Sequence, residues 1–343
     1  MNPLLGILLM SIGSLGAASF YVPIKRIRNW SWESYWIVQG IVSWLLAPWI
    51  FAYFTAPSGT LLDILTNSPV EAKWNAIIFG ALWGIGGLTF GLSMRFLGVA
   101  LGQSIALGFC AAFGTIIPPI LNHENLFGTS AGILILVGVS ICIAGIALIG
   151  YAGSLKDKGL TEEQKKEAIK DFALKKGLLI AMLAGIMSAC FSLGIEKGDA
   201  IRQIAEKTYL VNPLYSTNPV LIFILLGGFF TNLLYCGYLN IKNRTYTDYF
   251  SVSRGIFFNN LFFCLLGGTL WFLQFFFLGM GKSMLPESMK IFSWTILMAL
   301  NIAFSNIWGI ILHEWKGTNG KTKLVLVLGI FVLVLSTLVI SLK

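Results

Sequence analysis

Amide and tryptophan side chains recur at helical spacing in one long apolar stretch of the sequence. Residues separated by four, three, four and three positions share one face of a helix, and here they are Asn260, Cys264, Gly267, Trp271 and Gln274. Amides within a membrane are disfavoured unless they face protein or water. They donate and accept hydrogen bonds, and an indole packs on C–H groups, so the face suits a polyhydroxylated ligand. Hydrogen bonding between helices is the alternative interpretation.

A second polar face lies in the next apolar stretch. It is formed by Trp294, Met298, Asn301, Ser305 and Trp308. These side chains are polar or aromatic but uncharged, which favours a neutral ligand over an ion pathway. We therefore count Trp294 and Asn301 among the candidate binding residues.

Glycines recur every three or four residues in an earlier stretch, at Gly80, Gly84, Gly87 and Gly91, with Trp83 beside them. Small residues at this spacing let another helix approach closely. Helix packing is one interpretation, and a glycine-lined groove beside a substrate is the other. Trp83 is the candidate binding residue of this stretch.

Few ionisable residues lie near the apolar stretches. Glu196, at the end of one, and Glu33, in the run Trp30–Glu33, are the candidates for carrying a proton. A carboxyl group in apolar surroundings has a raised pKa, which suits that role. The alternative for Glu196 is that the side chain reaches water from the end of its helix.

The composition indicates that a membrane surrounds these faces. Of 343 residues, 56% are hydrophobic and 11% are charged, against about 25% charged in an ordinary soluble domain. A hydrocarbon core of about 30 Å needs roughly 20 helical residues per crossing. The sequence therefore predicts an all-α membrane protein of ten transmembrane helices, near 3–22, 35–55, 74–97, 101–121, 129–151, 177–196, 218–240, 257–280, 288–312 and 324–342.

The ten stretches form two groups of five that resemble copies. An offset of 171 residues aligns Phe20 with Phe191, and an offset of 188 aligns Trp83 with Trp271. Because five crossings is an odd number, the second copy enters the membrane from the opposite face, as in inverted-repeat transporters. We expect a first five-helix repeat at 1–152, a linker at 153–176 and a second repeat at 177–343.

Positive charges distinguish the two sides of this arrangement. Of the 24 Lys and Arg residues, 17 lie on one side, in the gaps 23–34, 95–100, 152–176, 241–256 and 313–323. Cytoplasmic loops have an excess of Lys and Arg, so this side is predicted to be cytoplasmic and both termini periplasmic. The lysine-rich linker is then cytoplasmic and has the pattern of an amphipathic surface helix.

Other classes of function find less support. The net charge of +9 comes from short gaps between apolar stretches, so no nucleic-acid partner is expected. The five cysteines lack metal-site spacing, and neither a metal nor a cofactor is expected. Two histidines and no nucleophile motif argue against an enzyme, with a membrane enzyme acting on lipid as the remaining alternative. The first apolar stretch has no preceding Lys or Arg, which predicts a retained helix rather than a signal peptide.

Several tryptophan-bearing stretches, in order along the chain, resemble those of a known family. They are Phe20-Tyr21 with Pro23 and Lys25, Trp30–Glu33, Gly40–Trp44, Pro48-Trp49, Gly80, Trp83–Gly86, Met94-Arg95, Leu97-Gly98, Lys175–Gly177, Pro213–Tyr215, Asn260, Trp271, Leu273–Phe277, Ser293-Trp294 and Glu314-Trp315. By these residues the chain is similar, over almost its whole length, to the L-rhamnose–proton symporters of the drug/metabolite transporter superfamily.

The resemblance implies ten helices in the bacterial inner membrane and proton-coupled uptake of L-rhamnose or a related deoxyhexose. A neutral sugar and a proton are then the partners, lipid is the surrounding medium, and the oligomeric state is open. We expect alternating access about a midplane cavity formed by the third, fourth, eighth and ninth helices. The expected sugar-binding residues are Trp83, Asn260, Trp271, Gln274, Trp294 and Asn301, with Glu33 or Glu196 accepting the coupling proton.

The sequence also departs from the family pattern. Gly87, Thr89 and Phe90 replace an Asn-x-Asn-Tyr run, Glu196 replaces an asparagine, and 288–290 replaces a Gln-Tyr-Asp run. These differences leave the sugar's identity open. Export of metabolites or drugs, by a member of the same superfamily, is the alternative direction of transport.

Overall fold

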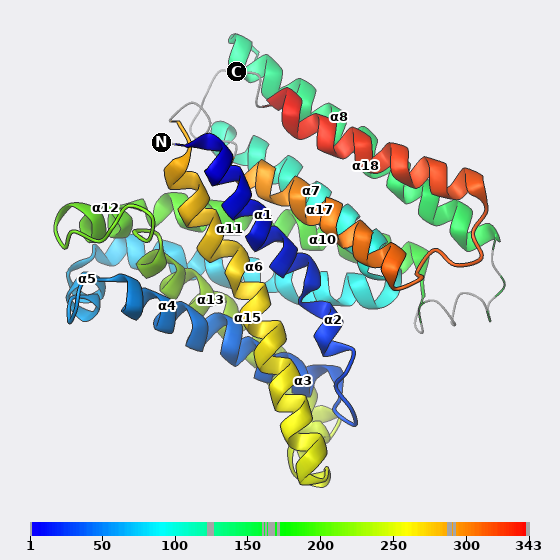
Figure 1. Cartoon of the computed structure of the whole chain (residues 1–343), viewed down its shortest axis with the longest axis horizontal. Helices are drawn as coiled ribbons and strands as arrows, with labels where there is room; N and C mark the ends of the chain where they lie inside the picture. The colour runs from blue at the N-terminus through cyan, green and yellow to red at the C-terminus, as the bar shows by residue number, and fades with distance from the viewer. Residues whose placement is uncertain are drawn as a thin grey trace. The chain divides into compact units, whose positions relative to one another are not determined.

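In the part of the chain that it describes, the computed structural model consists of helices joined by turns and loops (Figure 1). It describes residues 2–121, 127–159, 161, 163, 169, 172–286, 290 and 293–340, and none of these lies in a β-strand. The all-α prediction is therefore confirmed for the described residues.

Within the described part of the chain, eight helical segments are long and apolar enough to cross a membrane, and each overlaps one predicted span. They are Pro3–Ile24, Trp32–Thr55, Val70–Leu97, Leu136–Lys156, Leu174–Lys207, Asn218–Lys242, Arg254–Met284 and Ser293–Ile311. The other two predicted spans fall on α7 (Val99–Leu121), whose apolar part Leu101–Gly114 is shorter, and on α18 (Gly320–Ile340). The count of ten thus stays a prediction.

The helices form two compact units, each described here by itself. Unit 1 comprises Met1–Ile85 and Cys190–Met284, and unit 2 comprises Gly86–Ala189 and Leu285–Lys343. Each unit combines segments from both predicted repeats. The compact units and the sequence repeats are therefore two different divisions of the chain.

Unit 1 is built around α15, against which α1 lies along much of its length (Figure 1). A Cβ atom on Gly16 would lie 2.8 Å from the carbonyl oxygen of Leu270, so a larger residue would separate these two helices. The elements of unit 1 are α1 (Pro3–Ser19), α2 (Tyr21–Ile24), α3 (Trp32–Gly40), the π-helix η1 (Ile41–Leu46), α4 (Ala47–Thr55), α5 (Leu61–Asn67), the first part of α6 (Val70–Leu97), α11 (Cys190–Lys197), α12 (Asp199–Lys207), α13 (Asn218–Lys242), the 3-10 helix η2 (Thr245–Thr247), α14 (Asp248–Ser251) and α15 (Arg254–Met284).

The glycines of α6 bring its backbone into contact with α13. A Cβ atom on Gly80 would collide with the carbonyl oxygen of Ile224, and one on Gly84 would lie 2.9 Å from the carbonyl oxygen of Gly228. Small residues permit such backbone contact between membrane helices. Helix packing is therefore the role that the structure gives to Gly80 and Gly84.

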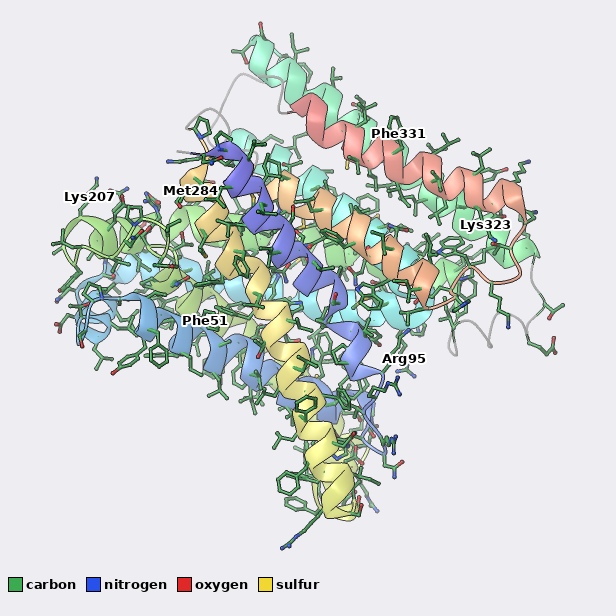
Figure 2. The ribbon with its side chains drawn as sticks, viewed as in Figure 1. Phe51, Arg95, Lys207, Met284, Lys323 and Phe331 are labelled. Carbon is green, nitrogen blue, oxygen red and sulfur yellow. The ribbon has the colours of Figure 1, made fainter. Side chains whose placement is uncertain are left out.

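In unit 2, α8 lies beside α18 (Figure 1), and α7 contacts both α10 and α17. Gly145 faces Leu333 of α18, whose backbone nitrogen would lie 2.9 Å from an added Cβ atom. The Phe331 side chain is 63% exposed on α18 (Figure 2), which suits contact with lipid rather than with water. Besides the second part of α6, the elements of unit 2 are α7, α8 (Ser130–Gly159), α10 (Leu174–Ser188), α17 (Ser293–Ile311) and α18.

Two predicted single helices are interrupted. The first span changes from α1 to α2 at Phe20, and the sixth changes from α10 to α11 at Ala189. Ser188 ends α10, whereas Ser192 and Glu196 lie on α11.

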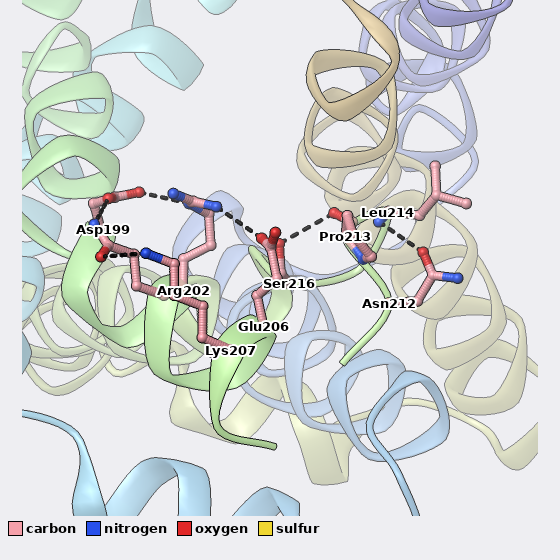
Figure 3. Close-up of polar contacts among 9 residues, drawn as sticks. Asp199, Arg202, Glu206, Lys207, Asn212, Pro213, Leu214 and Ser216 are labelled. Atoms are coloured by element: carbon pink, nitrogen blue, oxygen red, sulfur yellow. Dashed lines mark hydrogen bonds and ion pairs between the residues drawn. The ribbon is translucent and has the colours of Figure 1, made fainter. Parts of the chain in front are cut away.

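A small polar cap is formed in unit 1 by α5, α12 and the segment that follows α12. Its interior contains Ile64, Ala205 and Val211, which are buried together. On the outer face of α12, Arg202 forms ion pairs with Asp199 and Glu206 (Figure 3). With one apolar face and one charged face, α12 is amphipathic, so the continuously apolar part of the sixth span ends before it.

The predicted helix within the linker 153–176 falls mostly outside the described residues. At its two ends, α8 extends to Gly159 and α10 begins at Leu174. The departures at Ser288 and Met289 also lie outside the described residues.

Candidate functional site

Three indole rings from three separate elements meet inside unit 1. Trp44 of η1, Trp83 of α6 and Trp271 of α15 have ring centroids 5.4 to 6.1 Å apart. All three side chains are buried, with exposed fractions of 2%, 4% and 8%. We call these three residues the tryptophan triad. Phe191 and Phe275 extend it, with Phe275 centred 5.0 Å from Trp271.

Glycines create the space that the triad occupies. The ring of Trp83 packs directly on Gly228 of α13, where a Cβ atom would collide with Cζ3 of the indole. The ring of Trp44 packs on Gly40 in the same way. The indole positions are therefore determined by neighbouring backbone as well as by their own helices.

The predicted face of α15 is confirmed as one buried face. Its five residues, Asn260, Cys264, Gly267, Trp271 and Gln274, are all buried. The Gln274 side chain is 6% exposed, and its Nε2 donates a hydrogen bond to the carbonyl oxygen of Trp271 at 3.0 Å. This places an amide one helical turn from the triad.

Asn260, at the other end of that face, forms hydrogen bonds with the main chain of Arg28. Its Nδ2 donates to the carbonyl oxygen of Arg28 at 2.7 Å, and its Oδ1 accepts from the backbone nitrogen of Arg28 at 2.9 Å. With 0% exposure, the amide closes a two-bond clamp on the segment between α2 and α3. The structure brings Trp83 and Trp271 together and gives Asn260 a different contact.

The candidates of the ninth span lie in unit 2. Trp294 and Asn301 are buried on α17, with exposed fractions of 8% and 1%. On the same helix, Nδ2 of Asn306 donates to Oγ of Ser104 on α7 at 2.7 Å. This side-chain hydrogen bond links α17 to α7.

The two candidate proton carriers differ in their surroundings. Glu33 is 7% exposed, and its Oε1 accepts hydrogen bonds from Nδ2 of Asn243 and Oγ1 of Thr245, each at 2.9 Å. Glu196 is exposed on α11. Of these two candidates, Glu33 is the one whose carboxylate is buried and bound by neutral hydrogen-bond donors.

The surroundings of Glu33 join two loops of unit 1. Asp248 accepts a hydrogen bond from the backbone nitrogen of Ser31 at 2.7 Å, and its carbonyl oxygen accepts from Nε1 of Trp30 at 2.9 Å. Burial raises the pKa of Tyr249, so its phenol keeps the proton that it donates to the carbonyl oxygen of Ser34. These bonds tie the start of α3 to the segment that links α13 to α15.

One member of the triad and three residues of unit 1 were not among the sequence candidates. Trp44 belongs to the triad, Phe191 and Phe275 pack against it, and Gln39 lies buried at the end of α3. The stretches Gly40–Trp44 and Leu273–Phe277 contain Trp44 and Phe275, so for these two residues the family resemblance was the available signal. Helical periodicity alone does not find Gln39 or Trp44, because the π-helix interrupts the α-helical repeat.

Comparison with known proteins finds a family that matches almost the whole chain. The family model described as L-rhamnose-proton symport protein matches residues 2–343. The chain belongs to the L-rhamnose–proton symport protein family. This is a family of transporters and not of enzymes.

Curated members of the L-rhamnose–proton symport protein family match over nearly their whole length. The L-rhamnose-proton symporter of Yersinia pestis (strain Pestoides F) is 35% identical over 343 residues, covering 99% of this chain and 97% of the relative. That of Mannheimia succiniciproducens is 36% identical over 346 residues, with the same coverage. No solved structure matches the chain significantly. Family membership and the apolar helices make this a multi-pass membrane protein.

The arrangement found in this family member suits binding rather than covalent chemistry. Indole faces pack on C–H groups, and amides exchange hydrogen bonds with hydroxyls. Among the described residues, no group of three or more His, Cys, Asp or Glu side chains is placed to hold a metal ion. The triad and the neighbouring Gln274 thus offer apolar faces and a polar group at one place in unit 1.

Proposed function

We propose that this chain takes up L-rhamnose, or a closely related deoxyhexose, together with protons across the bacterial inner membrane. The observation that carries this proposal is full-length similarity to relatives named L-rhamnose-proton symporter. Their names favour uptake over the exporter alternative.

The tryptophan triad is the proposed centre of the sugar site. A deoxyhexose is neutral and has C–H faces and a methyl group between its hydroxyls, so one side of the ring can pack on an indole. Trp83 and Trp271 would provide the apolar surfaces, and Gln274 a group that both donates and accepts hydrogen bonds. In unit 2, Trp294 and Asn301 stay proposed substrate residues.

Asn260 acts, in this proposal, as a positioning residue. Both ends of its amide bind the backbone of Arg28, 232 residues away in the chain. A sugar would have to displace those bonds before it could use the same atoms. We therefore assign Asn260 to holding the segment before α3 in place on α15.

The architecture that we propose is ten transmembrane helices as two inverted five-helix repeats, 1–152 and 177–343. Two contacts in unit 1 support it. Gly80 packs on the carbonyl oxygen of Ile224, and Gly268, its partner at the offset of 188, packs on the carbonyl oxygen of Gln39. The third span on the seventh thus repeats as the eighth on the second, as inverted repeats require. From this repeat architecture we also propose alternating access and membership of the drug/metabolite transporter superfamily.

The proposed orientation has both termini in the periplasm. Within unit 1, the predicted cytoplasmic gaps 23–34 and 241–256 are joined through Asp248 and Ser31. Within unit 2, the gaps 95–100 and 152–176 are joined by a hydrogen bond from the backbone nitrogen of Ala173 to the carbonyl oxygen of Phe96. Contacts between gaps assigned to one side support that assignment, and the excess of Lys and Arg there favours the cytoplasm.

We propose Glu33 as the first candidate for the coupling proton, ahead of Glu196. A carboxyl group that alternates between neutral and charged forms needs partners that stabilise the charge without a fixed cation. Asn243 and Thr245 supply such partners at 2.9 Å, and the carboxylate is buried.

Uptake of labelled L-rhamnose into proteoliposomes, with and without an inwardly directed proton gradient, tests the proposal. We expect accumulation that a protonophore abolishes. Counterflow of labelled sugar in the absence of a gradient would show that the substrate is correct. Folded protein that shows neither uptake nor counterflow would contradict the proposed substrate, and efflux without uptake would favour an exporter.

A further inference from the structure

Buried indole nitrogens in unit 1 differ in whether they have a hydrogen-bond partner. Nε1 of Trp36 donates to Oδ1 of Asn232 at 2.8 Å, and Nε1 of Trp30 donates to the carbonyl oxygen of Asp248 at 2.9 Å. Nε1 of Trp44 has no partner among the described residues, although its side chain is only 2% exposed. A buried donor left without a hydrogen-bond partner destabilises the fold, so the contrast between these tryptophans calls for a physical reason.

A second unsatisfied atom lies five residues earlier. The Gln39 side chain is 1% exposed, and its Oε1 has no partner among the described residues. Its Nε2 lies 3.3 Å from Oγ of Ser43, which itself donates to the carbonyl oxygen of Gln39 at 3.1 Å. The single hydroxyl of Ser43 serves only one end of the amide, so Oε1 at the other end is left without a hydrogen bond from the described residues.

Both atoms belong to the junction between α3 and the π-helix η1. Gln39 is in the last turn of α3, and Trp44 is within η1. Short π-helical segments inside α-helices occur frequently at functional sites. Gly40 accommodates the Trp44 ring, since a Cβ atom there would lie 2.5 Å from its Cζ3. The local backbone thus turns the indole back over the residue that follows Gln39.

The junction adjoins the proposed sugar site. The Trp44 ring is centred 5.8 Å from that of Trp271 and 6.1 Å from that of Trp83, with interplanar angles of 85° and 88°. Gln39 contacts the same helix as Trp271, because its carbonyl oxygen would lie 2.8 Å from a Cβ atom on Gly268. An unsatisfied donor and an unsatisfied acceptor are therefore found beside the indole faces of Trp83 and Trp271.

We propose that Gln39 and Trp44 form the hydroxyl-recognition element of the sugar site. Nε1 of Trp44 donates to a sugar hydroxyl oxygen, and the free end of the Gln39 amide binds a second hydroxyl group. The ligand class is a neutral sugar with several hydroxyls and an apolar C–H face. This inference rests on the proposed function, and it adds specificity residues on the second span to those on the third and eighth.

Equilibrium binding to the purified full-length protein tests this element without depending on transport. The probes are labelled L-rhamnose and its 2-, 3- and 4-deoxy analogues as competitors. For the unaltered protein we expect two of the three analogues to bind at least about tenfold more weakly than L-rhamnose, because a site built around a hydroxyl rejects the analogue that lacks it.

Two conservative variants assign the hydroxyls. Trp44→Phe keeps an aromatic ring without the N–H group, and Gln39→Met keeps the length of the side chain without the amide. Each is expected to weaken L-rhamnose binding about tenfold, which corresponds to about 1.4 kcal/mol. Each variant should also lose discrimination against one deoxy analogue, and the two analogues should differ.

Trp36→Phe is the matched control, because its indole N–H is already bound to Asn232. It should lower the thermal unfolding temperature and leave the discrimination among analogues unchanged. If L-rhamnose binds but Trp44→Phe and Gln39→Met keep both affinity and discrimination, this inference is overturned while the proposed function stands. If the unaltered protein neither binds nor transports L-rhamnose, both are overturned.

Discussion

The indole rings of Trp83 on α6 and Trp271 on α15 lie with their centroids 5.4 Å apart at an interplanar angle of 36°. The Trp83 ring packs against Gly228 of α13, where an added Cβ atom would collide with it. The relationship makes the proposed sugar site sensitive to a residue that no sugar needs to touch. It also connects the packing of α6 on α13 to the geometry of the site.

Gly228→Ala should therefore displace the Trp83 ring and weaken sugar binding. We expect the dissociation constant for L-rhamnose to rise on the order of tenfold, or about 1.4 kcal/mol. Gly237→Ala on the same helix is the control, because nothing lies within 4 Å of its added Cβ atom. The dissociation constant for L-rhamnose is measured on both purified variants. Equal constants would contradict the proposal that Trp83 contacts the sugar.

Asn260→Ala should destabilise the protein rather than change sugar affinity directly. It removes both hydrogen bonds between its amide and the backbone of Arg28, at a cost of about 2 kcal/mol. The thermal unfolding temperature in detergent should fall, whereas Phe258→Ala, at a 64% exposed position on the same helix, should change it little. Weaker sugar binding at unchanged thermal stability would instead support direct contact between Asn260 and the sugar.

Glu33→Gln should uncouple transport from the proton gradient. The Gln side chain keeps an oxygen that accepts hydrogen bonds from Asn243 and Thr245 but cannot exchange a proton. We expect accumulation of L-rhamnose against a gradient to be lost while counterflow continues. Glu196→Gln, at an exposed position, should keep accumulation. The opposite pattern in the two variants would transfer the coupling role to Glu196.

Lys156→Met should lower the stability of unit 2. The Lys156 side chain is 2% exposed, and its Nζ donates to the carbonyl oxygen of Glu314 at 2.6 Å while lying 5.0 Å from the Trp315 ring centroid. Removing the cation leaves the buried Glu314 carboxyl group without its positive neighbour.

The thermal unfolding temperatures of Lys156→Met and of Lys158→Met test this prediction. Lys158 is exposed at the end of the same helix, so its replacement should have little effect. The additional substitution Glu314→Gln should restore part of the lost stability, because it removes the buried charge that interacts with the Lys156 cation. An unfolding temperature unaffected by Lys156→Met would show that the buried ammonium adds no net stability.

Local patterns in the sequence determined the class of the protein and the location of its helices. Apolar stretches of about 20 residues predict membrane crossings whatever their neighbours are, because the bilayer solvates any apolar helix. Spacings of three and four residues correctly predicted the buried face from Asn260 to Gln274, since helical geometry alone brings those side chains to one side. Family membership was likewise correctly predicted from the tryptophan-bearing stretches, which follow in order along the chain.

Only the tertiary structure decided which partners those side chains meet. Asn260 binds the backbone of Arg28 because α15 packs against the segment after α2, and periodicity within α15 contains no information about that segment. Trp44 reaches Trp83 and Trp271 because a π-helix turns the second span and glycines bring the backbones into contact. The unsatisfied atoms of Gln39 and Trp44 depend on every neighbouring group, so they are properties of the packed fold and of no single stretch of sequence.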